Sequence, residues 1–318
     1  MRKVLKNVSV LLMCMVLMMS VLTGCGNNDP TANHQTQQTE ERLDGVEGYP
    51  LTITDSFGKE VTLQKEPMRI VSIAPSVTEM IYAIGGEEKL VGRTDYCDYP
   101  EQVREIESVG PITPVDIEKI ISLEPDLVIT STHVYGEESE KLEEAGIPII
   151  GLYEVDKVEG VYTMLDTLGM ILNKQQEAEK VVQEMKTTIE EVQTKVASLE
   201  KPTVYYVVGY GEYGDFSAPE NTSIGEMIEL AGGKDIVPAS ESWSYSLEAL
   251  LAADPDIIVI RNGDKEGFMS AAGYNELTAV KEGHVYEIDN NLIDRQSNRN
   301  AEGILELAKI FHPEAFQS

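Results

Sequence analysis

The chain has 318 residues, which is enough for two ordinary domains. Its 25 basic and 55 acidic residues give a formal net charge of −30. This charge excludes nucleic acid and anionic lipid surfaces as main partners, because both would repel the chain.

The N-terminus has the pattern of a signal peptide. Basic residues (MRKVLK) precede an apolar run that ends at Gly24, and the run is too short to span a bilayer. We therefore expect residues 1–24 to be removed. LTGC at residues 22–25 resembles the bacterial lipobox, which implies a lipid on the sulfur of Cys25 and an extracytoplasmic position on the cell membrane. Cys97 is then left without an intrachain disulfide partner, and we expect it to be a small buried residue.

Residues 25–48 are polar and lack an apolar period, so they are predicted to be a disordered tether. YPLTITDSFGKEVTLQ then alternates apolar and polar residues on either side of Gly58, which predicts a hairpin.

Residues 49–156 are predicted to form an N-terminal lobe. After the hairpin, strands (RIVSIA, KLVG, DLVIT, IPIIGL) alternate with helices (SVTEMIYAIGG, IEKIISL, SEKLEEAG). Short apolar strands that alternate with helices indicate a mainly parallel sheet.

Residues 157–201 are predicted to bridge two lobes, through a helix over 157–172 and a long helix over 175–199. The long helix would span about 37 Å at 1.5 Å per residue. Strand and helix patterns then resume over 202–318 (TVYYVVGY, SIGEMIELAGG, LEALLAA, DIIVI, HVYEI, NAEGILELAKIFH). The fold class is therefore α/β, with two lobes of mainly parallel sheet joined by one long helix.

An internal repeat supports two similar lobes. EMIYAIGG at residues 79–86 returns as EMIELAGG at 226–233, and IEKIISLEPDLVI at 117–129 returns as LEALLAADPDIIVI at 247–260. Both matches occur in the same order, each at a helix or a helix-to-strand passage. Two related lobes joined by a long helix leave a cleft between them, and such clefts are favoured sites for small molecules.

Few residues indicate catalysis. GYGEYG at residues 209–214 has the GxGxxG spacing of a dinucleotide site, but the next helix is expected only at about Ser223, too late to hold a pyrophosphate. A nucleotide-dependent enzyme is thus a distant alternative, and we expect no enzyme, cofactor or metal. Aromatic residues instead gather in loops, which suits a large, flat, partly apolar ligand.

Several motifs together resemble the substrate-binding lipoproteins of ABC importers for cobalamin, iron-siderophores and haem. They are RIVSIAPSVTEMIYAIGG, VGRTDYCDYP, ESVG, IEKIISLEPDLVI and LAKIFHPE, within about residues 50–316. The resemblance implies a class III periplasmic-binding-protein-like fold with rigidly bridged lobes. VGRTDYCDYP is most similar to the cobalamin-binding branch, which implies a corrinoid ligand; a ferric siderophore or haem, with Tyr96 or Tyr210 as axial ligand, is the alternative.

The resemblance also implies a ligand site and a docking site. Its ligand-binding positions are Ser76, Tyr96, Phe216, Trp243, Asn291 and Arg295, with weaker candidates at Arg93, Tyr99, Tyr210, Tyr213 and Tyr245. Ile112 and Ser131 depart from the pattern, because a well-known cobalamin binder has tryptophans there.

Glu118 and Glu248 occupy matching places in the repeat and are similar to glutamates that pair with arginines of a dimeric membrane permease. The alternative is that they only favour the first turn of their helices through the helix dipole. We expect the protein itself to be a monomer.

Overall fold

The computed structural model describes residues 48–132, 136–153 and 157–317. The expected signal peptide, Cys25 and all but the last residue of the expected tether lie outside these ranges. Among the described residues, no helix is long and apolar enough to cross a membrane. The predicted hairpin is confirmed: β1 (Leu51–Thr54) pairs antiparallel with β2 (Glu60–Leu63), and Gly58 turns between them with φ +80°.

The N-terminal lobe contains a four-stranded parallel sheet with the order β4-β3-β5-β6. Its elements are β3 (Ile70–Ser72), α1 (Pro75–Ala83), β4 (Leu90–Arg93), α2 (Ile117–Ser122), β5 (Leu127–Thr130), α3 (Glu137–Glu144) and β6 (Ile149–Gly151). Cys97 is buried in this lobe, as expected, beside the hydroxyls of Thr78 and Thr94.

The C-terminal lobe repeats this topology, with the sheet order β10-β9-β7-β8. Its elements are β7 (Thr203–Val207), α6 (Ser223–Leu230), β8 (Lys234–Asp235), α7 (Leu247–Ala253), β9 (Ile257–Arg261), α8 (Lys265–Ser270), α9 (Thr278–Glu282) and β10 (Val285–Ile288). In each lobe the first strand lies between the second and the third, and the fourth lies beyond the third. Short 3-10 helices occur at Glu87–Lys89, Glu101–Glu105, Gly211–Tyr213, Tyr274–Glu276 and Pro313–Phe316.

The repeated Pro-Asp step has the same structural role in both lobes. The Asp126 carboxylate accepts hydrogen bonds from the backbone N–H groups of Met68 and Arg69, just before β3. The Asp256 carboxylate accepts from the N–H and the hydroxyl of Thr203, at the start of β7. Each aspartate thus fastens the incoming third strand to the first strand of its own sheet.

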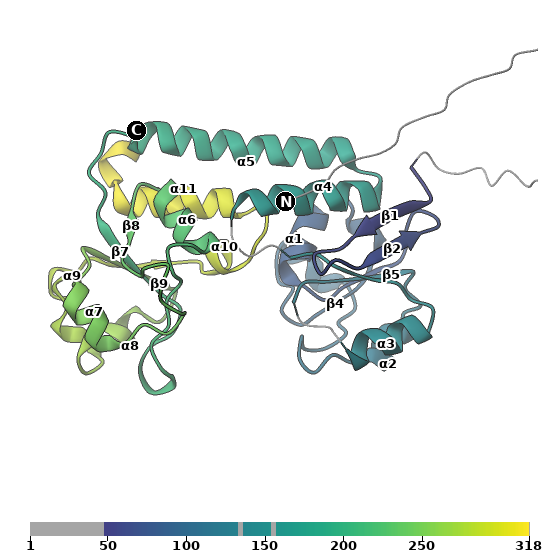
Figure 1. Cartoon of the computed structure of the whole chain (residues 1–318), viewed down its shortest axis with the longest axis horizontal. Helices are drawn as coiled ribbons and strands as arrows, with labels where there is room; N and C mark the ends of the chain where they lie inside the picture. The colour runs from purple at the N-terminus through teal and green to yellow at the C-terminus, as the bar shows by residue number, and fades with distance from the viewer. Residues whose placement is uncertain (1–47, 133–135, 154–156, 318) are drawn as a thin grey trace, which may run out of the picture. The chain divides into compact units, whose positions relative to one another are not determined.

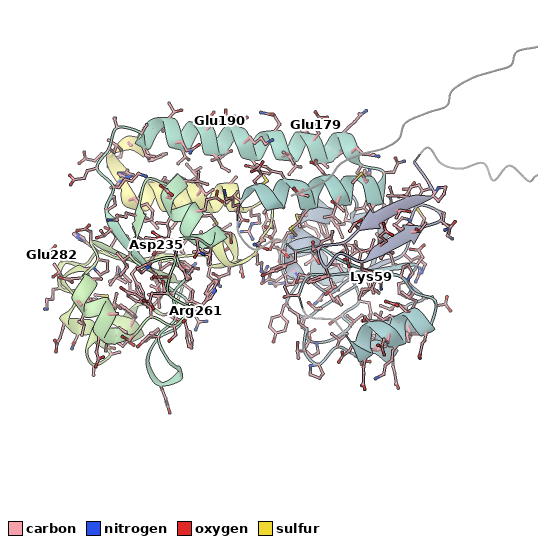
Figure 2. All side chains as sticks on the ribbon, in the orientation of Figure 1. Lys59, Glu179, Glu190, Asp235, Arg261 and Glu282 are labelled. Atoms are coloured by element: carbon pink, nitrogen blue, oxygen red, sulfur yellow. The ribbon has the colours of Figure 1, made fainter. Side chains whose placement is uncertain are left out.

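The bridge consists of α4 (Glu159–Leu172) and α5 (Gln175–Val196), and the chain ends with α10 (Asn291–Asp294) and α11 (Asn300–Phe311). α5 ends three residues earlier than the periodicity predicted, and its 22 residues span about 33 Å. It lies along α4 and α11 (Figure 1). Its apolar stripe faces inward, while Glu179 and Glu190 lie on its outer face (Figure 2).

One continuous hydrophobic core joins the two lobes beneath α5. It includes Ile81 of α1, Met185 of α5, Val204 of β7 and Leu307 of α11. The opposite face of each sheet is covered by the lobe's own smaller cluster. Parallel sheets need both faces covered, and the shared core supplies one cover for both lobes.

Candidate functional site

A cavity of about 280 Å³ lies between the lobes, near the lower end of the ~300–1,000 Å³ usual for ligand pockets. Most of its lining follows the carboxyl ends of parallel strands, where open α/β sheets bind ligands. The lining residues are Pro75, Ser76, Ser131, Thr132, Leu152, Tyr153, Met164, Thr222, Ser223, Ile224, Trp243, Asp294, Arg295 and Gln296.

Three of the predicted ligand-binding residues meet at this cavity. Ser76 is in the first turn of α1, Trp243 precedes α7, and Arg295 follows α10. Asn291, the first residue of α10, is half-buried and does not line the cavity. Ser131 does line it, so one of the two departures from the cobalamin-binding pattern lies at the cavity itself.

Tyr96, Phe216 and Trp243 present large apolar surfaces. Their exposed fractions are 56%, 38% and 45%, so part of each ring is free to contact a ligand. Trp243 is linked to Phe216 by backbone pairing, because Ser217 donates its N–H to the Trp243 carbonyl at 2.9 Å. The two aromatic side chains of the C-terminal lobe therefore stand on neighbouring, hydrogen-bonded segments.

The GxGxxG loop packs against Phe216 and does not form a phosphate-binding turn. The backbone of Phe216 pairs with Gly209, and Cβ atoms added to Gly209 and Gly214 would lie 3.2 Å and 3.0 Å from the Phe216 ring. α6 begins at Ser223, as the sequence predicted, so the loop contains a short 3-10 helix but does not open an α-helix. Close approach of this ring explains Gly209 and Gly214, and a backbone φ of +80° explains Gly211.

Two of the weaker candidates pack with the core of the C-terminal lobe, Tyr245 within it and the partly buried Tyr210 against it. Tyr245 is only 9% exposed, and its ring centroid is 6.0 Å from that of Tyr205. Tyr210 packs edge-on against Phe268 and Tyr274, at 5.2 Å and 5.8 Å between ring centroids. Both rings thus cover part of the apolar core of this lobe, and neither residue lines the cavity.

The other weaker candidates have protein partners or are not described. The Tyr99 ring lies under the Arg299 guanidinium, 3.8 Å from its Cζ atom. Arg93 donates to the carbonyls of Thr94 and Arg104 at the end of β4. The side chain of Tyr213 lies outside the described part of the chain.

Arg295 is held by acidic groups of the N-terminal lobe. Its Nη1 atom lies 2.7 Å from Glu79 Oε1 and 2.7 Å from Asp98 Oδ1, and its Nη2 atom donates to the Tyr96 carbonyl at 3.2 Å. Ser297 donates its hydroxyl to the other Glu79 oxygen at 2.7 Å. These contacts therefore join the segment after α10 to the N-terminal lobe at one edge of the cleft.

Glu79 was missed by the sequence reasoning. Its side chain is 1% exposed, and this burial raises the pKa of its carboxyl, against hydrogen bonds from Ser297 and Arg295 that favour the charged form. The available signal was an isolated acidic residue among apolar neighbours in SVTEMIYAIGG. A buried carboxylate requires partners, and Arg295 and Ser297 supply them.

Glu118 and Glu248 lie at equivalent, exposed positions in the first turns of α2 and α7. In Figure 1 both helices lie on the side of their lobe away from α5. The caps of these helices are made by other residues: Asp116 accepts from the N–H of Lys119, and Ser246 from that of Ala249. Capping therefore does not require either glutamate.

Comparison with known proteins gives consistent matches. A family described as periplasmic binding protein matches residues 70–292. An uncharacterised ABC transporter substrate-binding lipoprotein of Bacillus subtilis, YvrC, is 31% identical over 305 residues, covering 93% of this chain and 95% of that protein. A cobalamin-binding protein of Halobacterium salinarum is 27% identical over 279 residues, covering 83% and 74%.

A solved periplasmic haem-binding protein from Pseudomonas aeruginosa has the same fold, with a TM-score of 0.71 and 25% identity, covering 78% of this chain and 94% of that one. Two lobes of the same topology, a cavity between them and these matches lead to one assignment. The chain belongs to the periplasmic binding protein family and is a substrate-binding protein of an ABC importer, not an enzyme.

Proposed function

We propose that this protein is a lipid-anchored extracytoplasmic receptor that captures a corrinoid and delivers it to an ABC importer. The observation that carries the proposal is Trp243, a half-exposed aromatic at the cavity between the lobes, paired through its backbone with the segment that carries Phe216. A flat macrocycle covers such rings well. The cavity holds only part of a corrinoid, so we expect the rest to extend beyond it over the exposed ring of Trp243.

The charges at the cavity favour a ligand without strong negative charge. Among the described residues that line the cavity, Arg295 is the only basic one, and Glu79 and Asp98 already neutralise it. Asp294 adds a negative group, and Ser76 and Ser223 add neutral hydroxyl groups. Neutral amides, which surround a corrin, suit this lining better than the carboxylates of haem or of an acidic siderophore.

A haem receptor is the second candidate, because the Met164 side chain lines the cavity and a thioether is a known axial ligand of haem iron. The tyrosines expected for this role, Tyr96 and Tyr210, do not line it, and the ring of Tyr210 packs against Phe268.

Two titrations distinguish these ligands. Cyanocobalamin should quench the fluorescence of Trp243, the only tryptophan of the chain. Haemin should leave its Soret band unshifted on mixing with the protein. Absence of cyanocobalamin binding at micromolar ligand would remove the corrinoid proposal, and a Soret shift would favour haem.

Delivery requires a permease, and we propose that Glu118 and Glu248 dock on it. One exposed carboxylate per lobe, on equivalent helices, matches a partner made of two identical subunits. Exposed ion pairs contribute little affinity each, but they fix the register and speed the encounter.

We further propose that Cys25 carries the lipid anchor. Replacing it in Cys25→Ser should release the protein from membranes into the soluble fraction.

A further inference from the structure

The repeat contains a second pair of matching glutamates. Glu79 begins EMIYAIGG in α1, and Glu226 begins EMIELAGG in α6, so each lies on the first helix of its lobe. Neither lines the cavity. Both nevertheless accept hydrogen bonds from chain segments that follow the last strand of the other lobe.

Glu79 binds the segment that leaves the C-terminal lobe. After β10 and α10, this segment carries Arg295 and Ser297, whose guanidinium and hydroxyl groups both lie 2.7 Å from the Glu79 carboxylate. Arg299 adds a second guanidinium 3.7 Å away. Arg295 and the neighbouring Gln296 line the cavity, so this anchor lies directly behind the ligand site.

Glu226 binds the segment that leaves the N-terminal lobe. Its Oε2 atom accepts the backbone N–H of Val158 at 2.6 Å, immediately before α4. That N–H belongs to the free donors at the start of a helix, where a carboxylate is favoured by hydrogen bonding and by the helix dipole. Within the described ranges, no side chain preceding α4 caps its start, and the helix carries the cavity residue Met164.

We propose that Glu79 and Glu226 are matched positioning residues. Each holds in place the segment that follows the last strand of the other lobe. Together they fix where Arg295 and Met164 stand, and so set the geometry of the site. The effect on ligand binding rests on the function proposed above, whereas the anchoring does not.

Hydrogen exchange of the ligand-free, full-length protein tests the anchoring. Glu79→Gln should speed exchange in peptides covering 292–300 by about tenfold or more, and Glu226→Gln in peptides covering 157–163 by several-fold, since the amide that replaces each carboxylate carries no negative charge and accepts weaker hydrogen bonds. Glu229→Gln, an exposed position on α6, is the matched control and should change neither region. Unchanged exchange in both variants, or equal acceleration everywhere, overturns the proposal.

Cyanocobalamin affinity tests the positioning. Each variant should raise the Kd, by about tenfold for Glu79→Gln and less for Glu226→Gln, while the control stays at the wild-type value. Faster local exchange with an unchanged Kd overturns the positioning role. If Glu79→Gln does not fold, Ser297→Ala, which keeps the Arg295 pair, replaces it. If the wild type does not bind cyanocobalamin, the proposed function fails while the exchange result still decides the anchoring.

Discussion

Replacing Trp243 by alanine should weaken cyanocobalamin binding by up to about a hundredfold. The residue is 45% exposed, and burying a large aromatic side chain removes up to about 250 Å² from water, so about 110 Å² remain for a ligand to cover. At about 25 cal/mol per Å² this is about 2.8 kcal/mol, or two factors of ten in Kd. Because the variant lacks the fluorescent ring, titration calorimetry is the suitable assay.

Phe57→Ala is the matched control. Phe57 is 46% exposed at the turn between β1 and β2, and it does not line the cavity. This variant should bind cyanocobalamin with the wild-type Kd. A Kd for Trp243→Ala within threefold of wild type, or an equal loss in Phe57→Ala, would refute the assignment of Trp243 to the ligand surface.

Three further outcomes are expected. Reversing Glu118 and Glu248 together to arginine should abolish cellular cyanocobalamin uptake and leave the soluble Kd unchanged; normal uptake would exclude docking through these residues. Burial raises the pKa of Asp235 from 3.8 to about 7, so the folded state holds a proton that the unfolded chain releases above about pH 4. The protonated carboxyl therefore contributes about 4 kcal/mol to the free energy of unfolding below pH 4, and this contribution is lost as the pH rises towards 7. Urea unfolding at pH 5 and pH 8 should show that Asp235→Asn (Figure 2) flattens this loss, and equal slopes in both proteins would contradict it. Gly169→Ala places a Cβ 2.8 Å from that of Ala178 and should destabilise the α4–α5 contact by about 1–3 kcal/mol, seen as a lower Tm; an unchanged Tm would show that the helices can separate without cost.

The two sheets were predictable because short stretches of sequence indicate each strand and helix. Alternation of short apolar strands with helices gave both β/α lobes, and the repeated Pro-Asp step marked equivalent passages. The structure shows why the aspartate recurs: Asp126 and Asp256 each bind backbone donors at the start of the first strand. The long helix was also visible, since its apolar residues keep a helical period over six turns.

The site was predictable only in part, because side-chain partners far apart in sequence leave no local pattern. Glu79 and Arg295 are 216 residues apart, and each alone has the appearance of an ordinary polar residue. Tyr210 and Tyr245 lie in loops by sequence, yet tertiary packing places them against Phe268 and Tyr205. A loop assignment predicts exposure only where no neighbouring element covers the loop.

The hydrogen bonds that Glu79 and Glu226 accept from the other lobe differ in which substitutions can remove them. Glu226 is bound by a backbone N–H, which every residue except proline provides at position 158. Glu79 is bound by side chains, so a single change at Arg295 or Ser297 weakens it. During divergence, the Glu226 anchor therefore places no demand on the side chain at position 158, where packing alone constrains the buried Val158, whereas positions 79, 295 and 297 can change only together.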